Sequence, residues 1–253
     1  MAEVEFEVRD GIGIITLNRP EARNAVNGAV AAALADITES LETRADVRVA
    51  VLTGAGGNFC SGMDLKAFLR NEDVKPRGRG FAGLIRARID KPLIAAIEGY
   101  ALAGGFEIAL ACDLIVAATD ARFGLPEVKR GLVANAGGLV RLPSQLPYRI
   151  AMELVLTGAT VPAERLVALG LVNRVVAPGQ ALDEALRLAV EISSNGPLAV
   201  TTSKRVLRDS RDWPSTEAFD RQDAYTAPVF RSEDAREGAR AFAEKRAPRW
   251  IGR

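Results

Sequence analysis

The 253-residue chain contains no histidine and only two cysteines, Cys60 and Cys112. Without histidine it cannot form a Ser-His-Asp or Cys-His catalytic pair, a His-ligated metal site or an imidazole general base. Two cysteines are too few for a zinc ribbon or an iron–sulfur cluster, and they do not make a disulfide framework. We therefore expect no metal site, and expect Glu, Asp, Lys, Tyr or Cys side chains to carry any proton transfer near neutral pH.

The chain also lacks an excess of charge of either sign. Its 33 Lys and Arg residues face 32 Asp and Glu residues, which gives a formal net charge of +1. Binding to nucleic acid phosphates requires a clear excess of Lys and Arg on one face, so nucleic acid is not expected as the partner. With 48% hydrophobic and 26% charged residues, the composition is that of an ordinary globular protein, and we expect a small-molecule partner.

Long hydrophobic runs are absent as well. Residues 1–10 alternate and are acidic, unlike a secretory signal. The only candidate for a membrane span, residues 99–119, carries Glu107 and Asp113 near its middle, where each would cost roughly 2.5–3.5 kcal/mol in a membrane. We expect no membrane segment and, with so few cysteines, a reducing cytoplasmic location. The segment instead predicts a buried stretch of chain that holds two carboxylates.

Hydrophobic periodicity predicts alternating strands and helices in the first part of the chain. Alternation on both sides of Asp10-Gly11 predicts a hairpin. Apolar residues at helical spacing from Val26 to Leu41 predict a long amphipathic helix, and short apolar runs predict strands over residues 47–53 and 93–97. Residues 71–80 are rich in charge, glycine and proline, which predicts a mobile loop that leads into a helix over residues 81–89.

The same order continues with a helix over residues 104–111, a strand over residues 114–118 and an extended segment over residues 123–128. Such alternation favours an α/β fold with parallel strand pairing. From Gly179 onward the strand signals stop, and helical segments are separated by Gly196-Pro197, Pro214 and Pro228. We expect an α/β core over residues 1–195 and a helical region over residues 196–253.

Two glutamates and a glycine pair form the main candidate site. Gly104-Gly105 at a helix start allows close backbone approach to a ligand, and the free N–H groups of the first turn favour a negatively charged oxygen. Glu107 lies three residues into that helix. Glu127 follows twenty residues later, after a strand that can return it to the same cavity. Taken alone, the glycines also fit a tight turn, and Glu107 also fits a buried ion pair.

With these residues in place, the chain resembles the crotonase, or enoyl-CoA hydratase, superfamily along nearly its whole length. The order and spacing of several segments carry the resemblance together: Leu17-Asn18-Arg19-Pro20, Arg23-Asn24-Ala25, Phe59-Cys60-Ser61-Gly62-Met63-Asp64-Leu65-Lys66, residues 91–107, Phe123-Gly124-Leu125-Pro126-Glu127, Gly137-Gly138 and Phe242-Ala243-Glu244-Lys245-Arg246. The resemblance implies a superhelix of ββα units followed by a C-terminal helical trimerisation region.

The resemblance also implies a reaction. Glu107 and Glu127 match the two catalytic glutamates of enoyl-CoA hydratases, which add water across the double bond of an enoyl thioester. The backbone N–H groups of Met63 and Gly104 match the two donors of the oxyanion hole that binds the thioester carbonyl. No cofactor is implied, because the substrate arrives as a coenzyme A thioester. Two glutamates can divide acid and base work without a histidine.

Binding of coenzyme A is implied for residues in two regions of the chain. Ala22 and Arg23 border the nucleotide, and Lys66 approaches its phosphates. In the family's trimers and hexamers, the C-terminal helix of a neighbouring subunit would bring further contacts. The remaining residues of the implied set are Ser61, Asp64, Leu65, Phe242 and Lys245. For Asp64 the alternative is a local backbone contact, and for Lys66 it is an ordinary surface charge.

Three functions stay open on the sequence. The first is enoyl-CoA hydratase. The second is carnitinyl-CoA dehydratase, because Leu139-Val140-Arg141-Leu142-Pro143 and the C-terminal tail resemble that subgroup. The third is a non-catalytic acyl-CoA-binding protein, against which retention of both Glu107 and Glu127 argues. Asn135 stands where many hydratases have a small residue, and is expected either to favour a polar substrate or to cap the following helix.

Overall fold

The computed structural model describes residues 2–253 and is built around a six-stranded sheet. Its first two strands, β1 (Val4–Arg9) and β2 (Ile12–Leu17), form the predicted antiparallel hairpin, with Arg9 opposite Ile12. The other neighbours pair in parallel. In sheet order after β2 they are β3 (Val49–Gly54), β4 (Leu93–Ile97), β6 (Leu114–Ala118) and β9 (Arg174–Val176).

A second, smaller sheet receives the chain after β4 and β6. It contains β5 (Tyr100–Leu102), β7 (Arg122–Gly124) and β8 (Thr160–Pro162), and β5 and β7 pair in parallel with Leu102 opposite Gly124. The chain therefore passes from a strand of the large sheet to a strand of the small sheet and then to a helix, twice in succession. This confirms the predicted α/β crotonase-like superhelix of ββα units.

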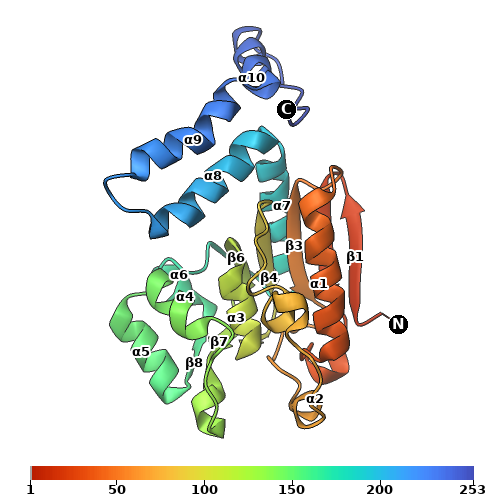
Figure 1. The fold of residues 1–253 in the computed structure, drawn as a ribbon. Helices are drawn as coiled ribbons and strands as arrows, with labels where there is room; N and C mark the ends of the chain where they lie inside the picture. Colours follow the sequence, from red (N-terminus) through yellow and green to blue (C-terminus); the bar gives the residue numbers. More distant parts are fainter. Residues whose placement is uncertain (1) are drawn as a thin grey trace.

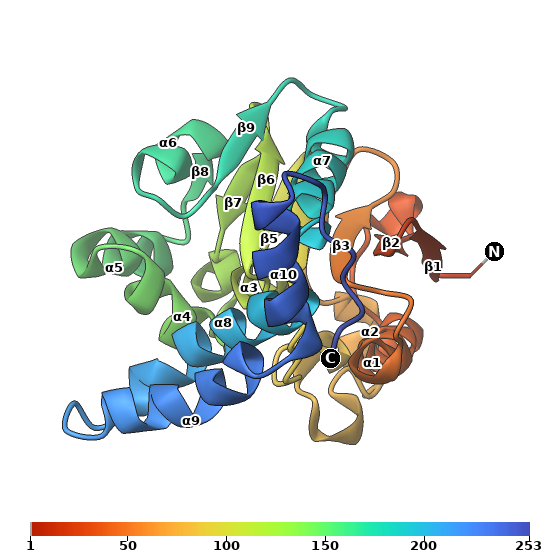
Figure 2. The same ribbon diagram turned by 90° about the horizontal axis from the view of Figure 1, so that it is seen from above.

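Both faces of the large sheet are covered by helices, as continuous apolar strands require. Helix α7 (Ala181–Ser193) packs on one face, where Ala185 and Ala189 meet Val51, Ile94 and Val116. Helix α1 (Gly28–Thr43), whose N-cap is Asn27, packs on the other face with α3 (Gly104–Ala111). Figure 2 shows α7 and α1 on opposite sides of β3. The site described below lies on the α1 and α3 side.

The remaining helices form two groups. Near the second sheet lie α4 (Gly138–Gln145), α5 (Tyr148–Thr157) and α6 (Ala163–Ala168), while α2 (Leu65–Leu69) follows the Met63 loop. The C-terminal group, α8 (Pro197–Asp209), α9 (Ala218–Phe230) and α10 (Glu233–Ala243), stands apart from the sheets (Figure 1). No residue of α8 or α9 is buried within the described chain. The division at residues 195 and 196 stays a prediction, and Met1 lies outside the described residues.

Two predicted elements are wrong. Residues 81–89 do not form an α-helix, because Gly80, Ala82 and Gly83 have φ values of +77°, +57° and +64°, in the left-handed region, and only a 3₁₀ turn over Phe81–Gly83 forms. The extended segment over residues 123–128 ends early, because β7 stops at Gly124 and a 3₁₀ helix, Pro126–Arg130, follows. The strand expected over residues 47–53 starts two residues later. Whether residues 71–80 are mobile stays a prediction.

None of the helices in residues 2–253 is both long and apolar enough to cross a membrane.

Candidate active site

The Met63 loop and the start of α3 lie against each other. The backbone of Cys60 pairs with β5, accepting a hydrogen bond from Leu102 N at 3.0 Å. A Cβ atom added to Gly62 would lie 3.1 Å from Gly104 N and 2.8 Å from Ala103 Cβ, so the two loops are in direct contact. Gly62 also has φ +100°, a conformation that other residues rarely adopt. The glycine therefore allows both the turn and the close approach.

Two backbone donors at this contact have no acceptor within the described chain. On either side of Met63, Gly62 O accepts from Val26 N at 2.8 Å and Asp64 N donates to Val26 O at 2.9 Å. Neither Met63 N–H nor Gly104 N–H donates a hydrogen bond to any of residues 2–253. Two free N–H groups from adjacent loops, one of them at a helix N-terminus, can bind an oxyanion.

The start of α3 is held in a strained conformation. Ala103, the residue before the helix, has φ +50° and ψ −128°, a region that costs on the order of 1–3 kcal/mol for a residue other than glycine. Its N–H donates to Gly124 O at 2.9 Å, which ties it to β7. The ring of Phe81 closes the other side, since a Cβ on Gly104 would lie 2.4 Å from Phe81 Cε1. The surroundings therefore fix the direction of the Gly104 N–H.

Glu107 is almost fully buried, with 3% of its surface exposed. Its Oε1 accepts a hydrogen bond from Gly138 N at 2.8 Å. Burial raises the pKa of Glu107 to about 7, and the charge of Glu127 adds to the rise. A carboxyl group in this setting exchanges its proton near neutral pH, as general acid–base catalysis requires.

Glu127 approaches the same place from the second sheet. Strands β5 and β7 run parallel, so the segments after them begin at the same edge of the sheet, one with Gly104 and one with Leu125. A Cβ on Gly138 would lie 3.0 Å from both Glu107 Oε1 and Leu125 Cδ1, which places Gly138 between the two glutamate segments. Burial raises the pKa of Glu127, and its buried Oε2 has no hydrogen-bond partner among residues 2–253. Glu127 therefore lies two residues beyond Leu125, on the other side of Gly138 from Glu107, and its charge raises the pKa of Glu107.

Replacing Glu107 with glutamine is expected to stabilise the fold at alkaline pH. A carboxyl whose folded pKa is raised from 4.5 to about 7 loses stability as the pH rises between those values, because the folded state holds the proton that the unfolded state releases. Glu107→Gln removes this effect, so its free energy of unfolding at pH 8 should exceed that of the wild type by about 1–3 kcal/mol. Urea unfolding at pH 4 and pH 8 measures it, and a gain that is equal at both pH values would contradict the raised pKa.

Six of the eight residues implied in coenzyme A binding lie in two segments beside the free donors. Ser61 N donates to Arg23 O at 3.0 Å, and Ser61 Oγ donates to Ala22 O at 3.4 Å. The Arg23 guanidinium lies 5.6 Å from the centre of the Tyr100 ring. Leu65 and Lys66 are exposed in the first turn of α2. Segments 22–23 and 61–66 therefore form one continuous surface next to Met63.

Asp64 has a structural role in this surface. Its Oδ1 caps α2, accepting from Lys66 N at 2.9 Å and Ala67 N at 3.3 Å, and its Oδ2 accepts from Arg19 at 3.2 Å. These bonds outweigh partial burial and lower the pKa of Asp64. The local backbone contact expected as the alternative role of Asp64 is confirmed.

Phe242 and Lys245 do not lie at this site within one chain. Phe242 is near the end of α10 with 88% of its surface exposed, and Lys245 follows the helix. Figure 1 shows α10 at the opposite end of the molecule from α2. A contact between these residues and the site would have to come from another subunit.

Cys60 packs as a small buried residue. Burial raises the pKa of its thiol to about 12, so it is not a nucleophile near neutral pH. Within residues 2–253, no three His, Cys, Asp or Glu side chains are grouped in a way that would hold a metal ion.

Three contributors to the site were not predicted from the sequence. Phe81 lies behind Gly104, the backbone N–H of Gly138 holds Glu107, and the Arg141 guanidinium lies on the neighbouring Gly137. The Gly137-Gly138 pair was a signal for the second of these, since a helix that starts on two glycines can approach a carboxylate closely. The contact between Phe81 and Gly104 was not predicted, because residues 81–89 were expected to form a helix. Asn135 does not cap α4, whose N-cap is Gly137.

The superhelix of ββα units defines a protein of the crotonase class. The sequence model described as Enoyl-CoA hydratase/isomerase matches residues 7–253. The crystal structure of enoyl-CoA hydratase EchA1 from Mycobacterium marinum superposes with a TM-score of 0.98 at 58% identity, with 100% of both chains covered. The chain belongs to the enoyl-CoA hydratase/isomerase family.

Curated relatives carry two different names. The enoyl-CoA hydratase EchA19 of Mycobacterium tuberculosis (strain H37Rv) is 44% identical over 251 residues, which cover 95% of this chain and 93% of that protein. The carnitinyl-CoA dehydratase of Escherichia coli (strain K12) is 43% identical over 247 residues, which cover 94% of each chain. The family is therefore established, and these two relatives are named for different activities.

Proposed function

We propose that the protein is an enoyl-CoA hydratase that catalyses the reversible syn addition of water to a trans-2-enoyl-CoA, giving a 3-hydroxyacyl-CoA. The observation that carries the proposal is the Glu107 and Glu127 pair, both with raised pKa values, beside the free N–H groups of Met63 and Gly104. The name of the relative EchA19 and that of the M. marinum structure support the same reaction.

The reaction begins when the two N–H groups bind the thioester oxygen and draw electron density from the double bond. The β-carbon then accepts the oxygen of a water molecule held between the glutamates, and the C=C π electrons move toward the thioester to form an enolate. One carboxylate takes the proton that water loses, and the other, as carboxylic acid, gives a proton to the α-carbon. The two glutamates exchange one proton to reset the pair.

We assign Glu127 as the acid that protonates the α-carbon and Glu107 as the group that orients and activates the water. The positions of the two glutamates in the family resemblance carry this assignment, and Oε2 of Glu127, without a partner among residues 2–253, is free to hold a proton. The Gly138 N–H favours the charged form of Glu107, whereas burial favours its protonated form and raises its pKa to about 7. Because the two groups interact, the pair titrates with shared macroscopic pKa values.

We further propose that the surface formed by segments 22–23 and 61–66 binds coenzyme A, with Arg23 and Lys66 facing its phosphates. Lysine and arginine side chains neutralise phosphate charge, and both of these are exposed beside the Met63 loop. Phe242 and Lys245 of a neighbouring subunit would complete the binding surface.

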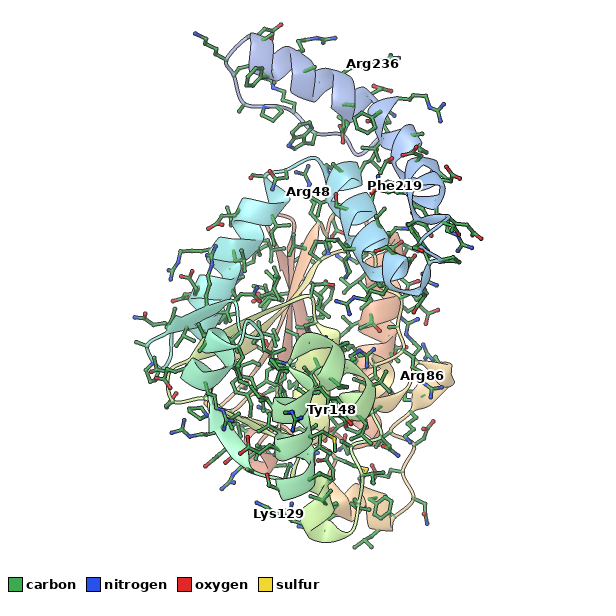
Figure 3. All side chains as sticks on the ribbon, turned by 90° about the vertical axis from the view of Figure 1, so that its left-hand side faces the viewer. Arg48, Arg86, Lys129, Tyr148, Phe219 and Arg236 are labelled. Carbon is green, nitrogen blue, oxygen red and sulfur yellow. The ribbon has the colours of Figure 1, made fainter. Side chains whose placement is uncertain are left out.

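This arrangement requires a homotrimer or a hexamer of two trimers, and the exposed apolar residues of the C-terminal region support such an assembly. Phe219 is 77% exposed and Phe230 81% exposed, both on α9. Figure 3 shows Phe219 on the part of the molecule that stands away from the sheets. Covering these two rings with another chain would remove their apolar surface from water.

Replacing Phe219 and Phe230 together by aspartate is expected to break the assembly. Each change places a charge in the interface. It also removes the apolar burial of one phenylalanine, about 1.5–3 kcal/mol of stabilisation per interface. Light scattering after size exclusion should give three or six times 27.0 kDa for the wild type and a lower mass for the variant. Ala29→Asp, an exposed change on α1, is the control. A wild type with the mass of one chain would contradict the proposal.

Carnitinyl-CoA dehydratase is the second candidate, favoured by the 43% identity to the E. coli enzyme and by Asn135. Asn135 is exposed three residues before Gly138, whose N–H donates to Glu107. An amide at that point favours a substrate with a polar acyl group over a plain hydrocarbon chain.

A panel of enoyl-CoA esters tests the proposed function. Short, long, branched, steroid and crotonobetainyl esters are compared by kcat/KM with the wild-type protein. The proposal predicts hydration of a hydrocarbon enoyl-CoA with the highest kcat/KM, whereas a clear preference for the crotonobetainyl ester would favour the second candidate. Tight binding of the esters without hydration of any would favour a non-catalytic acyl-CoA-binding protein and overturn the proposal.

A further inference from the structure

Arg141 is a half-buried cation beside the glutamate pair that makes no salt bridge to the described residues. It lies one turn into α4, and its Nη2 donates to Ile85 O at 2.6 Å. Burial lowers the pKa of Arg141, while the nearby Glu107 raises it. A guanidinium that is partly removed from water without a direct carboxylate partner is costly unless its charge serves a nearby group.

The side chain of Arg141 folds back over the loop that holds Glu107. A Cβ on Gly137 would lie 2.2 Å from Arg141 Nη1, so the guanidinium lies directly on Gly137. The next residue, Gly138, donates its backbone N–H to Glu107 Oε1 at 2.8 Å. Arg141 thus lies against the segment that positions the carboxylate.

The same side chain reaches the segment behind the oxyanion donors. Ile85, which accepts the bond from Arg141, donates through its own N–H to Phe81 O at 3.3 Å. The Phe81 ring in turn packs on Gly104. The Arg141 guanidinium therefore connects the 136–138 loop, which holds Glu107, to the segment of Phe81, which packs on Gly104.

The charges around Glu107 come from three elements. Glu127 faces it from the 3₁₀ helix after β7, and Arg141 faces it from α4. The charge of Arg130 lowers the pKa of Glu127. The Cys112 thiol at the end of α3 is near Arg141, and Asp113 and Lys204 are near that thiol. The Arg141 guanidinium lies on Gly137, one residue before the Gly138 N–H that donates to Glu107 Oε1.

We propose that Arg141 is a positioning residue that holds the 136–138 loop against Glu107 and keeps the Glu107 carboxylate charged, so that it can take a proton from water. This inference rests on the proposed role of Glu107. It differs from a purely structural role because it requires the positive charge of Arg141 and not only its bond to Ile85.

The experiment follows the titration of Glu107 directly. Protein labelled with ¹³C at the glutamate carboxyl carbons is titrated by NMR, and the Glu107 signal is assigned from its loss in Glu107→Gln. Arg141→Gln should move the midpoint upward by about one pH unit, whereas Arg141→Lys should move it less. Arg149→Gln removes an exposed charge on α5, and Gln145→Ala removes a neutral bond from α4 to Leu110 O, so neither control should move it.

The rate of hydration provides a second readout. A midpoint that rises from about 7 to about 8 should lower kcat/KM at pH 7 about fivefold in Arg141→Gln and restore it at higher pH. An unchanged midpoint in a folded Arg141→Gln would overturn the inference, whatever the rate. An upward shift in a protein that hydrates no enoyl-CoA would uphold the effect of Arg141 on Glu107 and overturn the proposed function instead.

Discussion

Replacing Glu127 with glutamine is expected to lower kcat for hydration of crotonyl-CoA by about 10²–10⁴-fold. The amide occupies the same space but cannot give a proton to the α-carbon. KM should change little, because the Met63 and Gly104 donors and the surface of segments 22–23 and 61–66 remain. Oε2 of Glu127 has no hydrogen bond to the described residues, so the change breaks no hydrogen bond of the folded chain, and the fold should persist.

Glu164→Gln is the matched control for this variant. Glu164 is exposed in the first turn of α6, away from the pair, and its replacement should leave kcat unchanged. Near-normal turnover by a folded Glu127→Gln protein would remove Glu127 as the acid and leave the proton on Glu107.

Replacing Gly104 with alanine is expected to lower kcat by about 10²–10³-fold, the usual cost of losing one oxyanion donor. The new Cβ would lie 2.4 Å from Cε1 and 2.7 Å from Cζ of Phe81, so either the ring or the first turn of α3 must move. Since Ala103 already holds a strained conformation, movement of the helix start turns the Gly104 N–H away from its direction.

A second substitution separates the clash from other effects. Gly104→Ala combined with Phe81→Ala removes the ring and should recover most of the lost kcat. Gly196→Ala, whose Cβ would meet only ordinary contacts at 3.6 Å or more, is the control for a Gly-to-Ala change. Full activity of the single Gly104→Ala variant would show that the position of this N–H does not limit the reaction.

Most of the fold follows from local patterns in the sequence. Helix α3 and strands β4 and β6 have the predicted bounds, because each is a continuous apolar run bordered by glycine, proline or charged residues. The site follows from the same patterns, since Glu107 stands in α3 and Glu127 after the next pair of strands. The short strands β5, β8 and β9 carry too little periodicity to be assigned from the sequence.

What the sequence does not reveal depends on contacts between distant residues. The failed helix over residues 81–89 has apolar residues at fitting positions, but Gly83 packs against α1, where a Cβ would lie 2.6 Å from Ala31 O. Tertiary packing thus overrides the local preference. Arg141 could not be distinguished from a surface arginine in the sequence. It is partly buried only because the folded chain brings Ile85 next to α4.

The most direct test of the central claim is the enone absorbance of crotonyl-CoA mixed with the purified wild-type protein. The account predicts that the absorbance falls to the hydration equilibrium at a rate proportional to the protein concentration, and that Glu127→Gln slows this fall by at least about 10²-fold. If the ester binds and its absorbance does not fall, the glutamate pair does not hydrate this substrate, and the account is contradicted.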